Sequence, residues 1–534
     1  MKLNKSKLLG AMFLATVVGA SSCADKLNLE PLDNYGSTTF WRNEAHVVGA
    51  MNGIYVKVRN LAWTHSFTLG ELRGGTLEQG AGVDGSSLFG GDIISHNLRS
   101  DNTGISNFGG YYGPIQDVNL LIDRLEKFTM TEAAKKYFLG QAYGLRAFLY
   151  FDLYRTYGGV PLRLTPDVVN GERDANKLMG ERATPSAVMA QIKADIAKSL
   201  ENFGTVKTFD AYGVGGQKSA WSKAATETLK GEVYLWNAKV TIGDQTATSA
   251  DLAEAKTALE SVLANYSLSL QTEYAKVFSS TNKGNSEVIF ASRFLDGEAV
   301  SSGFSQFLYR NDGSIKTLYK ADGTTRFGDA LAIQTTGVLR YQYKQALYNM
   351  YASGDTRQTA TFEPVYNKDK SLAVAIVKKN IGEVNAQGNR VYSGDIIHYR
   401  LADVILMLAE VANMQGDNTA VKTYIDKIRE RAYTASVFTA DPTLAYTLST
   451  DFKANELAIL AERTKEFVQE GKRWYDLVRM RDAQSSGKAL VFMTEGTIDG
   501  ATYVLNPAEE YKLLWPVDKT TLNNDTKLKQ TPGY

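Results

Sequence analysis

The chain has 534 residues, with one cysteine, four histidines and 59 Lys+Arg against 58 Asp+Glu. A single cysteine excludes a disulfide within the chain and a cysteine-rich zinc site, and the balanced charge argues against a dedicated nucleic-acid binder. Hydrophobic residues make up 44%, as in globular proteins, and the length exceeds what one core organises, so we expect several packed subregions.

The N-terminus has the features of a lipoprotein signal peptide. Three lysines in the first seven residues precede the apolar, uncharged run 8–20, which is too short to span a bilayer. Small residues then lead directly to Cys23. We expect residues 1–22 to be removed and Cys23 to carry the lipid, the only predicted membrane anchor. The alternative is an ordinary secretory signal followed by an incidental cysteine.

After the signal peptide, the sequence predicts a tether, helical segments and two irregular regions. Residues 23–40 are polar and predict a lipidated tether, and a helix follows over about 41–58. Residues 70–113 are rich in glycine and show no helical period, which predicts a long loop system. The helical pattern weakens again over about 270–395, apart from a short predicted strand at 287–291.

Elsewhere, apolar residues recur at helical spacing between clear start and stop signals. Thr184 followed by Pro185 predicts an N-cap and a first helical position, and Gly158 predicts a helix end. The expected helices cover about 116–128, 132–157, 184–203, 219–240, 251–265, 399–415, 418–433 and 506–515. A coil closes the chain.

Small residues recur at the same place in three of these helices. Gly-Gln-Ala-Tyr at 140–143 corresponds to Gly-Glu-Val-Tyr at 231–234, and 409–412 is a looser third copy. Each copy is followed by a second amphipathic helix, and small side chains let a partner helix approach closely. The pattern predicts stacked tetratricopeptide-like helix pairs, and therefore a mainly α fold with long irregular loops and a few short strands.

These elements predict a single domain over residues 41–534. In it, a helical-repeat frame at about 116–265 and 399–480 carries a loop-rich ligand region at about 60–113 and 270–395. Loops this long in a compact protein usually have a function.

A search for catalytic motifs finds none that is complete. Residues 213–219 invite comparison with a phosphate-binding loop, but Gln217 stands where the motif needs glycine and no strand precedes it. There is no Gly-x-Ser-x-Gly or His-Glu-x-x-His motif, and the four histidines are far apart in sequence. We expect no catalytic residue, no metal site and no cofactor.

Three glutamates, Glu462, Glu466 and Glu470, are spaced four apart and are expected to line one helical face. Paired carboxylates can hydrolyse glycosides. Several cations lie between and beyond them, however, and favour a structural ion network instead. These cations are Arg463, Lys465, Lys472, Arg473 and Arg479.

Aromatic and polar side chains in the irregular regions predict a ligand surface. Aromatic rings stack on the C–H faces of sugars, while Asn, Asp and Arg bond their hydroxyl groups. The alternative is that these aromatics only pack the loops down. The candidate ligand-binding residues are Arg73, Phe89, Asp101, Asn102, Tyr111, Tyr112, Phe304 and Tyr309, with Phe108 and Phe307 nearby.

Several sequence blocks together carry a family resemblance. They are Cys23 with Leu29-Glu30-Pro31, Phe40-Trp41, 140–147 with 157–162, 399–404 with 409–410, 428–432, Glu462-Arg463 with 466–477, Leu514-Trp515-Pro516, and Gln530-Thr531-Pro532-Gly533-Tyr534. With these blocks the chain resembles the SusD/RagB family of outer-membrane nutrient-binding lipoproteins of Bacteroidota, over nearly its whole length.

The resemblance implies a tetratricopeptide-containing α fold and a place on the cell surface, at the outer membrane. It implies a partner, a SusC-like TonB-dependent β-barrel transporter, which the lipoprotein covers as a lid. The family captures an oligomeric nutrient and catalyses no reaction.

The resemblance leaves the nutrient open. An oligosaccharide is the leading expectation, and an oligopeptide is the alternative within the same role. Starch-type members carry a tryptophan-rich arc that has no counterpart here, which argues against starch. A surface glycoside hydrolase and a protein-binding helical scaffold without a small ligand are more distant alternatives.

Overall fold

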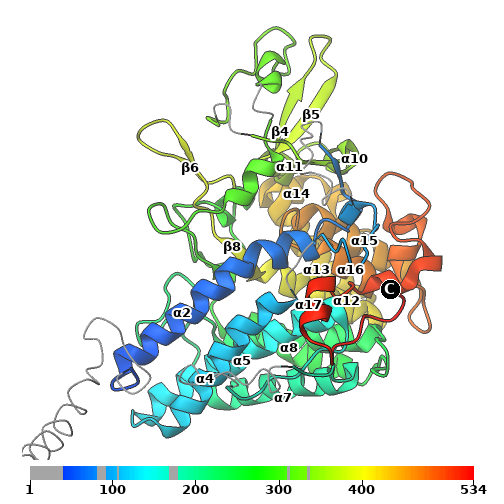
Figure 1. Cartoon of the computed structure of the whole chain (residues 1–534). Helices are drawn as coiled ribbons and strands as arrows, with labels where there is room; N and C mark the ends of the chain where they lie inside the picture. The colour runs from blue at the N-terminus through cyan, green and yellow to red at the C-terminus, as the bar shows by residue number, and fades with distance from the viewer. Residues whose placement is uncertain (1–39, 81–91, 105–107, 167–178, 310–312, 334–336) are drawn as a thin grey trace, which may run out of the picture.

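A computed structural model of the chain describes six stretches, residues 40–80, 92–104, 108–166, 179–309, 313–333 and 337–534 (Figure 1). The signal peptide, Cys23, nearly all of the tether and Phe89 lie outside them, so the predictions made there stay predictions. None of the helices within these stretches combines the length and the apolar character needed to cross a membrane.

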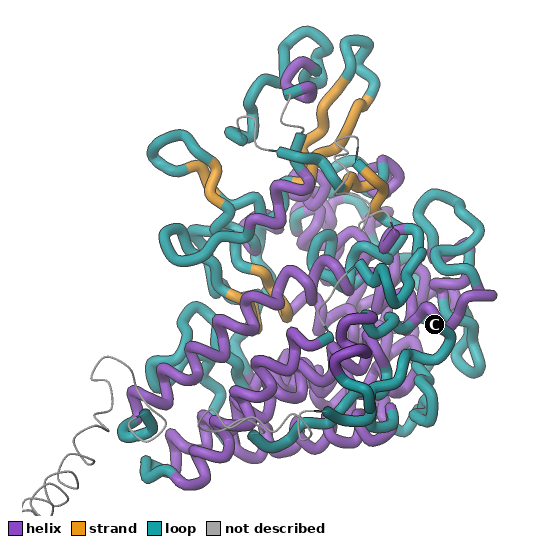
Figure 2. Tube along the Cα trace, in the orientation of Figure 1, coloured by secondary structure: helices purple, strands orange, loops and turns teal. Residues whose placement is uncertain are grey.

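The fold is mainly helical, as predicted, and the strands are short (Figure 2). The long helices are α2 (Glu44–Trp63), α4 (Tyr112–Lys127), α5 (Glu132–Tyr157), α7 (Pro185–Phe203), α8 (Lys223–Lys239), α9 (Asp251–Asn265), α12 (Leu401–Met414), α13 (Asn418–Tyr433) and α15 (Phe452–Glu466). Shorter helices are α10 (Gln345–Asn349), α11 (Thr356–Thr361), α14 (Ala435–Ala440), α16 (Arg473–Arg479) and α17 (Lys519–Asn524). Most long helices gather in the lower part of Figure 1, which α2 crosses diagonally.

The frame consists of packed helix pairs. Helix α5 packs against α7, α8 against α9, and α12 against α13, while α7 also contacts α8 and α9 contacts α12. The repeated glycines explain the close packing: a Cβ at Gly140 of α5 would lie 2.9 Å from the Phe203 ring of α7, and one at Gly231 of α8 would lie 2.4 Å from Leu259 of α9. The predicted role of the small residues is therefore confirmed.

Helix ends follow the capping signals. Thr184 is the N-cap of α7 with Pro185 at its first position, and Gly158 ends α5. Two predicted starts were too early: α2 begins at Glu44 after the N-cap Asn43, and α8 begins at Lys223 after Ser222. The predicted helix at 506–515 is a 3-10 helix over Pro507–Leu513.

Each strand pairs with one partner, antiparallel, in a two-stranded ribbon: β1 with β3, β2 with β8, β4 with β5, and β6 with β7. The bounds are β1 (Leu77–Gln79), β2 (Val288–Ser292), β3 (Tyr341–Tyr343), β4 (Phe362–Tyr366), β5 (Leu372–Val377), β6 (Glu383–Val384), β7 (Arg390–Val391) and β8 (Ile396–Arg400). Strand β8 corrects the expected helix over 399–415, because the chain stays extended through Arg400 and becomes helical only at Leu401. The region 270–395 is also more ordered than predicted, since it holds most of these strands.

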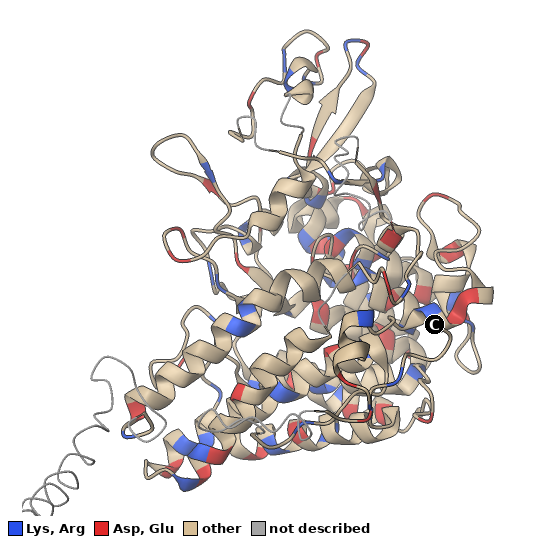
Figure 3. Cartoon of the chain, viewed as in Figure 1, with Lys and Arg blue, Asp and Glu red and all other residues tan. Residues whose placement is uncertain are grey.

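One large hydrophobic core joins the N-terminal helix to the C-terminal segments, from Val47 to Leu528. Trp221, Trp236, Trp474 and Trp515 are among its largest fully buried side chains. A smaller core underlies the β4–β5 hairpin. Basic and acidic residues are interspersed along the described helices and loops (Figure 3).

Candidate functional site

The candidate site begins where α2 ends. Helix α2 runs directly into a π-helix over Thr64–Leu69. π-Helical turns are rare in proteins, and those that occur are often found at functional sites. Trp63, the last residue of α2, is only partly buried at this junction. This junction lies at one end of the predicted loop-rich ligand region.

An aromatic cluster surrounds this junction. It comprises Trp63, Phe67, Phe304, Phe307, Tyr341 and Tyr392, which we call the Trp63 cluster. The Trp63 ring lies 4.7 Å from that of Phe67 and 5.7 Å from that of Phe304, between centroids. Phe307 lies 6.0 Å from Tyr341, and Phe304 stacks on Tyr392 at 6.2 Å. The cluster therefore joins four separate parts of the sequence.

Glycine allows the close approach in this cluster. A Cβ at Gly303 would lie 2.5 Å from the Trp63 indole, so only glycine fits against that ring. Phe67, Phe304 and Phe307 are buried, whereas Trp63, Tyr341 and Tyr392 keep part of their surface in solvent. Half-exposed rings fixed by a buried aromatic base are suited to stack on the apolar faces of a ligand.

A polar pocket of about 340 Å³ lies further back along α2. Asn52, Tyr55, Val56 and Arg59 of α2 line one wall, and β2, the 213–219 segment and Glu298 complete it. We call it the α2–β2 pocket. Arg59 precedes Trp63 by four residues, so the pocket and the Trp63 cluster lie along one side of the same helix.

The pocket contains an ion pair at its edge. Arg59 Nη1 donates to the Glu298 carboxylate at 2.5 Å and to the Arg293 carbonyl at 3.3 Å. The hydrogen bond from Arg59, together with the charges of Arg59, Arg293 and Lys283, lowers the pKa of Glu298. The carboxylate therefore stays ionised in a basic environment.

Two of the residues predicted to bind ligand are buried in the core. Arg73 lies over the Trp474 ring at 3.9 Å, and its Nε donates to His96 Nδ1 at 3.1 Å. Burial lowers the pKa of Arg73 to about 10. Tyr111 is also buried and donates to the Asp152 carboxylate at 3.3 Å. In this conformation both side chains have packing roles.

The other predicted residues are spread over the molecule. Phe304 belongs to the Trp63 cluster, while Tyr309 is fully buried and donates to Asp329. Half-buried Tyr112 donates to the Pro161 carbonyl at 2.8 Å. Exposed Asp101 pairs with Arg99 at 3.3 Å, and Asn102 donates to Asp92. The described structure therefore brings only one of the predicted residues, Phe304, into this cluster.

Sequence reasoning missed Trp63, Tyr341 and Tyr392. All three lie in the predicted loop-rich region, but nothing in the local sequence distinguishes Tyr341 and Tyr392 from the aromatics that are buried. One usable signal was Trp63 itself, a large aromatic at the end of an amphipathic helix and beside a glycine-rich segment.

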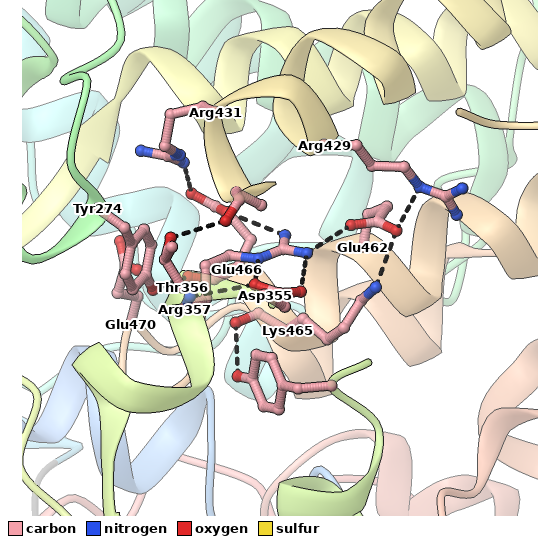
Figure 4. A network of polar contacts seen from close by, with 12 residues as sticks. Tyr274, Asp355, Thr356, Arg357, Arg429, Arg431, Glu462, Lys465, Glu466 and Glu470 are labelled. Carbon is pink, nitrogen blue, oxygen red and sulfur yellow. Dashed lines mark hydrogen bonds and ion pairs between the residues drawn. The ribbon is translucent and has the colours of Figure 1, made fainter. Parts of the chain in front are cut away.

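The glutamates at 462, 466 and 470 belong to a buried ion network, as predicted (Figure 4). Arg400 donates to Glu466 at 2.7 Å and to Glu470 at 2.6 Å. Arg357 donates to Glu462 at 3.1 Å and to Glu466 at 3.2 Å. One detail differs from the prediction: α15 ends at Glu466, so Glu470 lies in the following turn and not on the same helical face.

Most of the cations predicted to neutralise these glutamates form ion pairs or hydrogen bonds with other residues instead. Lys465 pairs with Glu462 at 2.9 Å, but Arg463 and Lys472 pair with Asp403 at 2.9 and 2.8 Å. The remaining partners come from elsewhere: Arg479 pairs with Glu410 and Asp476, and Arg473 bonds Thr464 and the carbonyl oxygens of Gly74 and Gly496.

This environment has a chemical consequence. Burial alone would raise the pKa of Glu462, but Arg357, Lys465 and Arg429 hold it at about 2. Glu462 and Glu466 have no solvent-exposed surface. Neither carboxylate can reach a glycosidic bond, so the network has the properties of a structural element.

Two family descriptions match parts of the sequence. The SusD family matches residues 366–534, and a family described as starch-binding associating with outer membrane matches residues 86–207. SusD-like protein P38 from Formosa agariphila is 24% identical, with both chains covered in full.

Solved structures share the fold. A SusD superfamily protein from Bacteroides fragilis is 50% identical, with a TM-score of 0.85 over 93% of this chain and all of that one. NanU from B. fragilis is 33% identical, with a TM-score of 0.79 over 95% of this chain and all of NanU. A laminarin binding SusD-like protein is 20% identical, with a TM-score of 0.68 over 92% of this chain and all of that one, and shares the fold.

Proposed function

Since the chain belongs to the SusD/RagB family, we propose that it captures an oligosaccharide at the cell surface and delivers it to an outer-membrane transporter. The transporter is a SusC-like TonB-dependent β-barrel, which the protein covers as a lid. The observation that carries the glycan assignment is the half-exposed part of the Trp63 cluster, formed by Trp63, Tyr341 and Tyr392. Rings of this kind bind the C–H faces of sugars.

The relatives support this assignment. One family description names starch binding and association with the outer membrane, and one structural neighbour is described as binding laminarin. We infer a lipid anchor at Cys23, which fits the described membrane association. The loop-rich region contributes further contacts in this proposal, with Phe89, Asp101, Asn102 and Tyr112 as candidates.

Calorimetric titration of the mature protein with a panel of neutral oligosaccharides tests the proposal. We expect at least one to bind, and the Trp63→Ala variant to lose roughly 10-fold in affinity, because a central aromatic contact is removed. Tyr503→Ala is the matched control, since Tyr503 is 37% exposed and lies outside the cluster. Melting curves of both variants verify that they fold.

Three outcomes separate the alternatives. Binding of a peptide mixture in place of every glycan would support the same role with oligopeptide cargo. Release of reducing ends from a bound glycan would indicate a hydrolase. If the protein copurifies with a β-barrel but binds neither glycans nor peptides, it acts as a protein-binding scaffold and the proposal is wrong.

A further inference from the structure

The α2–β2 pocket holds more positive than negative charge. Its lining contains two cations, Arg59 and Arg293, and one carboxylate, Glu298, while Lys283 and Asp395 line the neighbouring cavity. Lys283 pairs with Asp395 at 3.0 Å, and Arg59 pairs with Glu298 at 2.5 Å. The two carboxylates are thus both engaged, and one cation remains.

The remaining cation is Arg293. It lines the pocket and forms no ion pair with any residue of the described stretches. Its Nε is buried and makes no hydrogen bond there either. A guanidinium that is partly withdrawn from water without a direct ion pair is unfavourable, and its planar fork of donors matches a carboxylate.

A backbone wall faces this guanidinium. Gly213 and Gly215 line the pocket with left-handed φ angles of 72° and 68°, and a Cβ built at Gly216 would lie 4.0 Å from Arg293 Nη1. The amides of Gly213 and Gly215 donate no hydrogen bond within the described parts of the chain. Val214, which lies between these glycines, donates its amide to the Ala211 carbonyl at 3.4 Å, so two separate backbone amides remain that can donate to an anionic group.

A small core connects the pocket with the Trp63 cluster. Arg59 lies over the Phe294 ring at 6.0 Å, and Phe294 packs in a small core against which Trp63 also lies. A sugar chain stacked on the Trp63 cluster therefore has a cationic pocket beside it, about one to two helical turns away along α2.

We propose that the α2–β2 pocket binds the carboxylate of an acidic sugar unit in the captured oligosaccharide, with Arg293 as its principal partner. The inference rests on the proposed function and adds the charge class of the cargo. The carboxylate supplies the direct ion pair that Arg293 lacks, and Arg59 exchanges part of its contact with Glu298 for the ligand.

A pair of ligands that differ only in charge tests this inference. Trigalacturonate and its fully methyl-esterified form are titrated into the mature protein. We expect the charged form to bind about 10-fold more tightly, because a charge-assisted hydrogen bond to Arg293 contributes roughly that gain in affinity. The difference should shrink as salt is added, because the contact is ionic.

Two variants should shift the preference in opposite directions. Arg293→Gln is expected to abolish it, whereas Glu298→Gln should strengthen binding of the charged form several-fold by removing a competing carboxylate. A misfolded variant would not gain affinity. Lys57→Gln is the matched control: Lys57 is on α2 and half-exposed, but it pairs with Asp117 at 2.6 Å outside the pocket.

The outcomes distinguish this inference from the proposed function. If both forms bind equally and both weaken in Trp63→Ala, the glycan function stands and the acidic-sugar inference is overturned. It is equally overturned if Arg293→Gln keeps the preference, or if neutral glycans bind but trigalacturonate does not. Arg293-dependent binding of triglutamate without trigalacturonate would assign the pocket to acidic peptides and refute the sugar assignment.

Discussion

Glu71 is a buried carboxylate two residues beyond the π-helix, with 2% of its surface exposed. It accepts hydrogen bonds from the Tyr343 hydroxyl at 3.2 Å and from the Gln469 amide at 3.3 Å. Burial raises its pKa from 4.5 to about 7, against the opposing effect of these bonds and of Lys379 and Arg473. The folded protein therefore favours the protonated form.

This shift predicts a pH dependence of stability. Because the folded pKa exceeds the unfolded one, the contribution of Glu71 is fully present below about pH 4.5 and is lost as the pH rises through about 7. We expect Glu71→Gln to raise the urea midpoint at pH 8 relative to wild type, and to change it far less at pH 4.5. The exposed Glu78→Gln is the control, and equal shifts at both pH values would contradict the prediction.

Cys23 carries the second prediction at this scale. Cys23→Ala is expected to move the protein from the outer-membrane fraction to the soluble fraction, because the proposed lipid is its only predicted anchor. Fractionation followed by immunoblotting measures this. Ser22→Ala keeps a small residue before the cysteine and should leave the protein membrane-bound. Membrane retention of Cys23→Ala would count against lipidation.

Single residues also show the limit of sequence reasoning about the site. Polar and aromatic residues in loops were expected to form a ligand surface, and of these only Phe304 lies in the Trp63 cluster within the described residues. Arg73 and Tyr309 have the same character in sequence but are fully buried. Which side of a loop faces solvent depends on contacts with distant segments, such as Trp474 over Arg73, and local sequence does not contain them.

At the scale of elements, the close contact between α5 and the start of α8 depends on glycine. We expect Gly144→Ala to lower the melting temperature strongly, since the new Cβ would lie 2.0 Å from Trp221 Nε1 and the indole itself donates to Thr226 at 2.8 Å.

Gly49→Ala is the matched control for this substitution. Gly49 is an exposed helical glycine of α2 with no atom within 4 Å of an added Cβ. There, alanine should stabilise by roughly 0.5–1 kcal/mol through its helix propensity. If Gly144→Ala changes the melting temperature no more than Gly49→Ala does, the Trp221 ring can move aside without cost and the prediction is wrong.

Helices with local boundary signals were predicted well, and elements without them were not. Residues 251–265 and 418–433 were predicted with the bounds that the structure has for α9 and α13. Strand β8 was missed because Ile396–Arg400 continues directly into the apolar helix α12 without a turn or capping signal between them. Its extended form depends on pairing with β2, more than 100 residues earlier.

At the scale of the whole molecule, the ion network joins the second irregular region to the C-terminal helices. Glu287 precedes β2, Arg400 ends β8, and Arg431 and Glu466 lie on α13 and α15. Arg400 bonds both Glu287 and Glu466 at 2.7 Å, and Arg431 also bonds both. Each member is almost completely withdrawn from solvent.

Removing one charge should therefore destabilise the entire fold. We expect Glu466→Gln to lower the free energy of unfolding by about 3–5 kcal/mol, since three arginines lose a buried partner. Denaturant titration at neutral pH measures this. Glu495→Gln, which breaks the exposed Lys453 pair at 2.5 Å, should change it by less than about 1 kcal/mol. Similar effects of both substitutions would contradict the structural importance of the network.

The same network constrains when the native state can form. Its members are contributed by residues from 287 to 470, so a chain that lacks the last acidic block contains Arg357, Arg400 and Arg431 with Asp355 and Glu287 as their only carboxylate partners in the network. Burying those cations early would be too costly, and contacts across such long separations form slowly. The C-terminal half should thus fold late and in one cooperative step. The proposed function requires the chain to cross the inner membrane before it folds. A chain that stays unfolded until its C-terminal segment is synthesised remains competent for export.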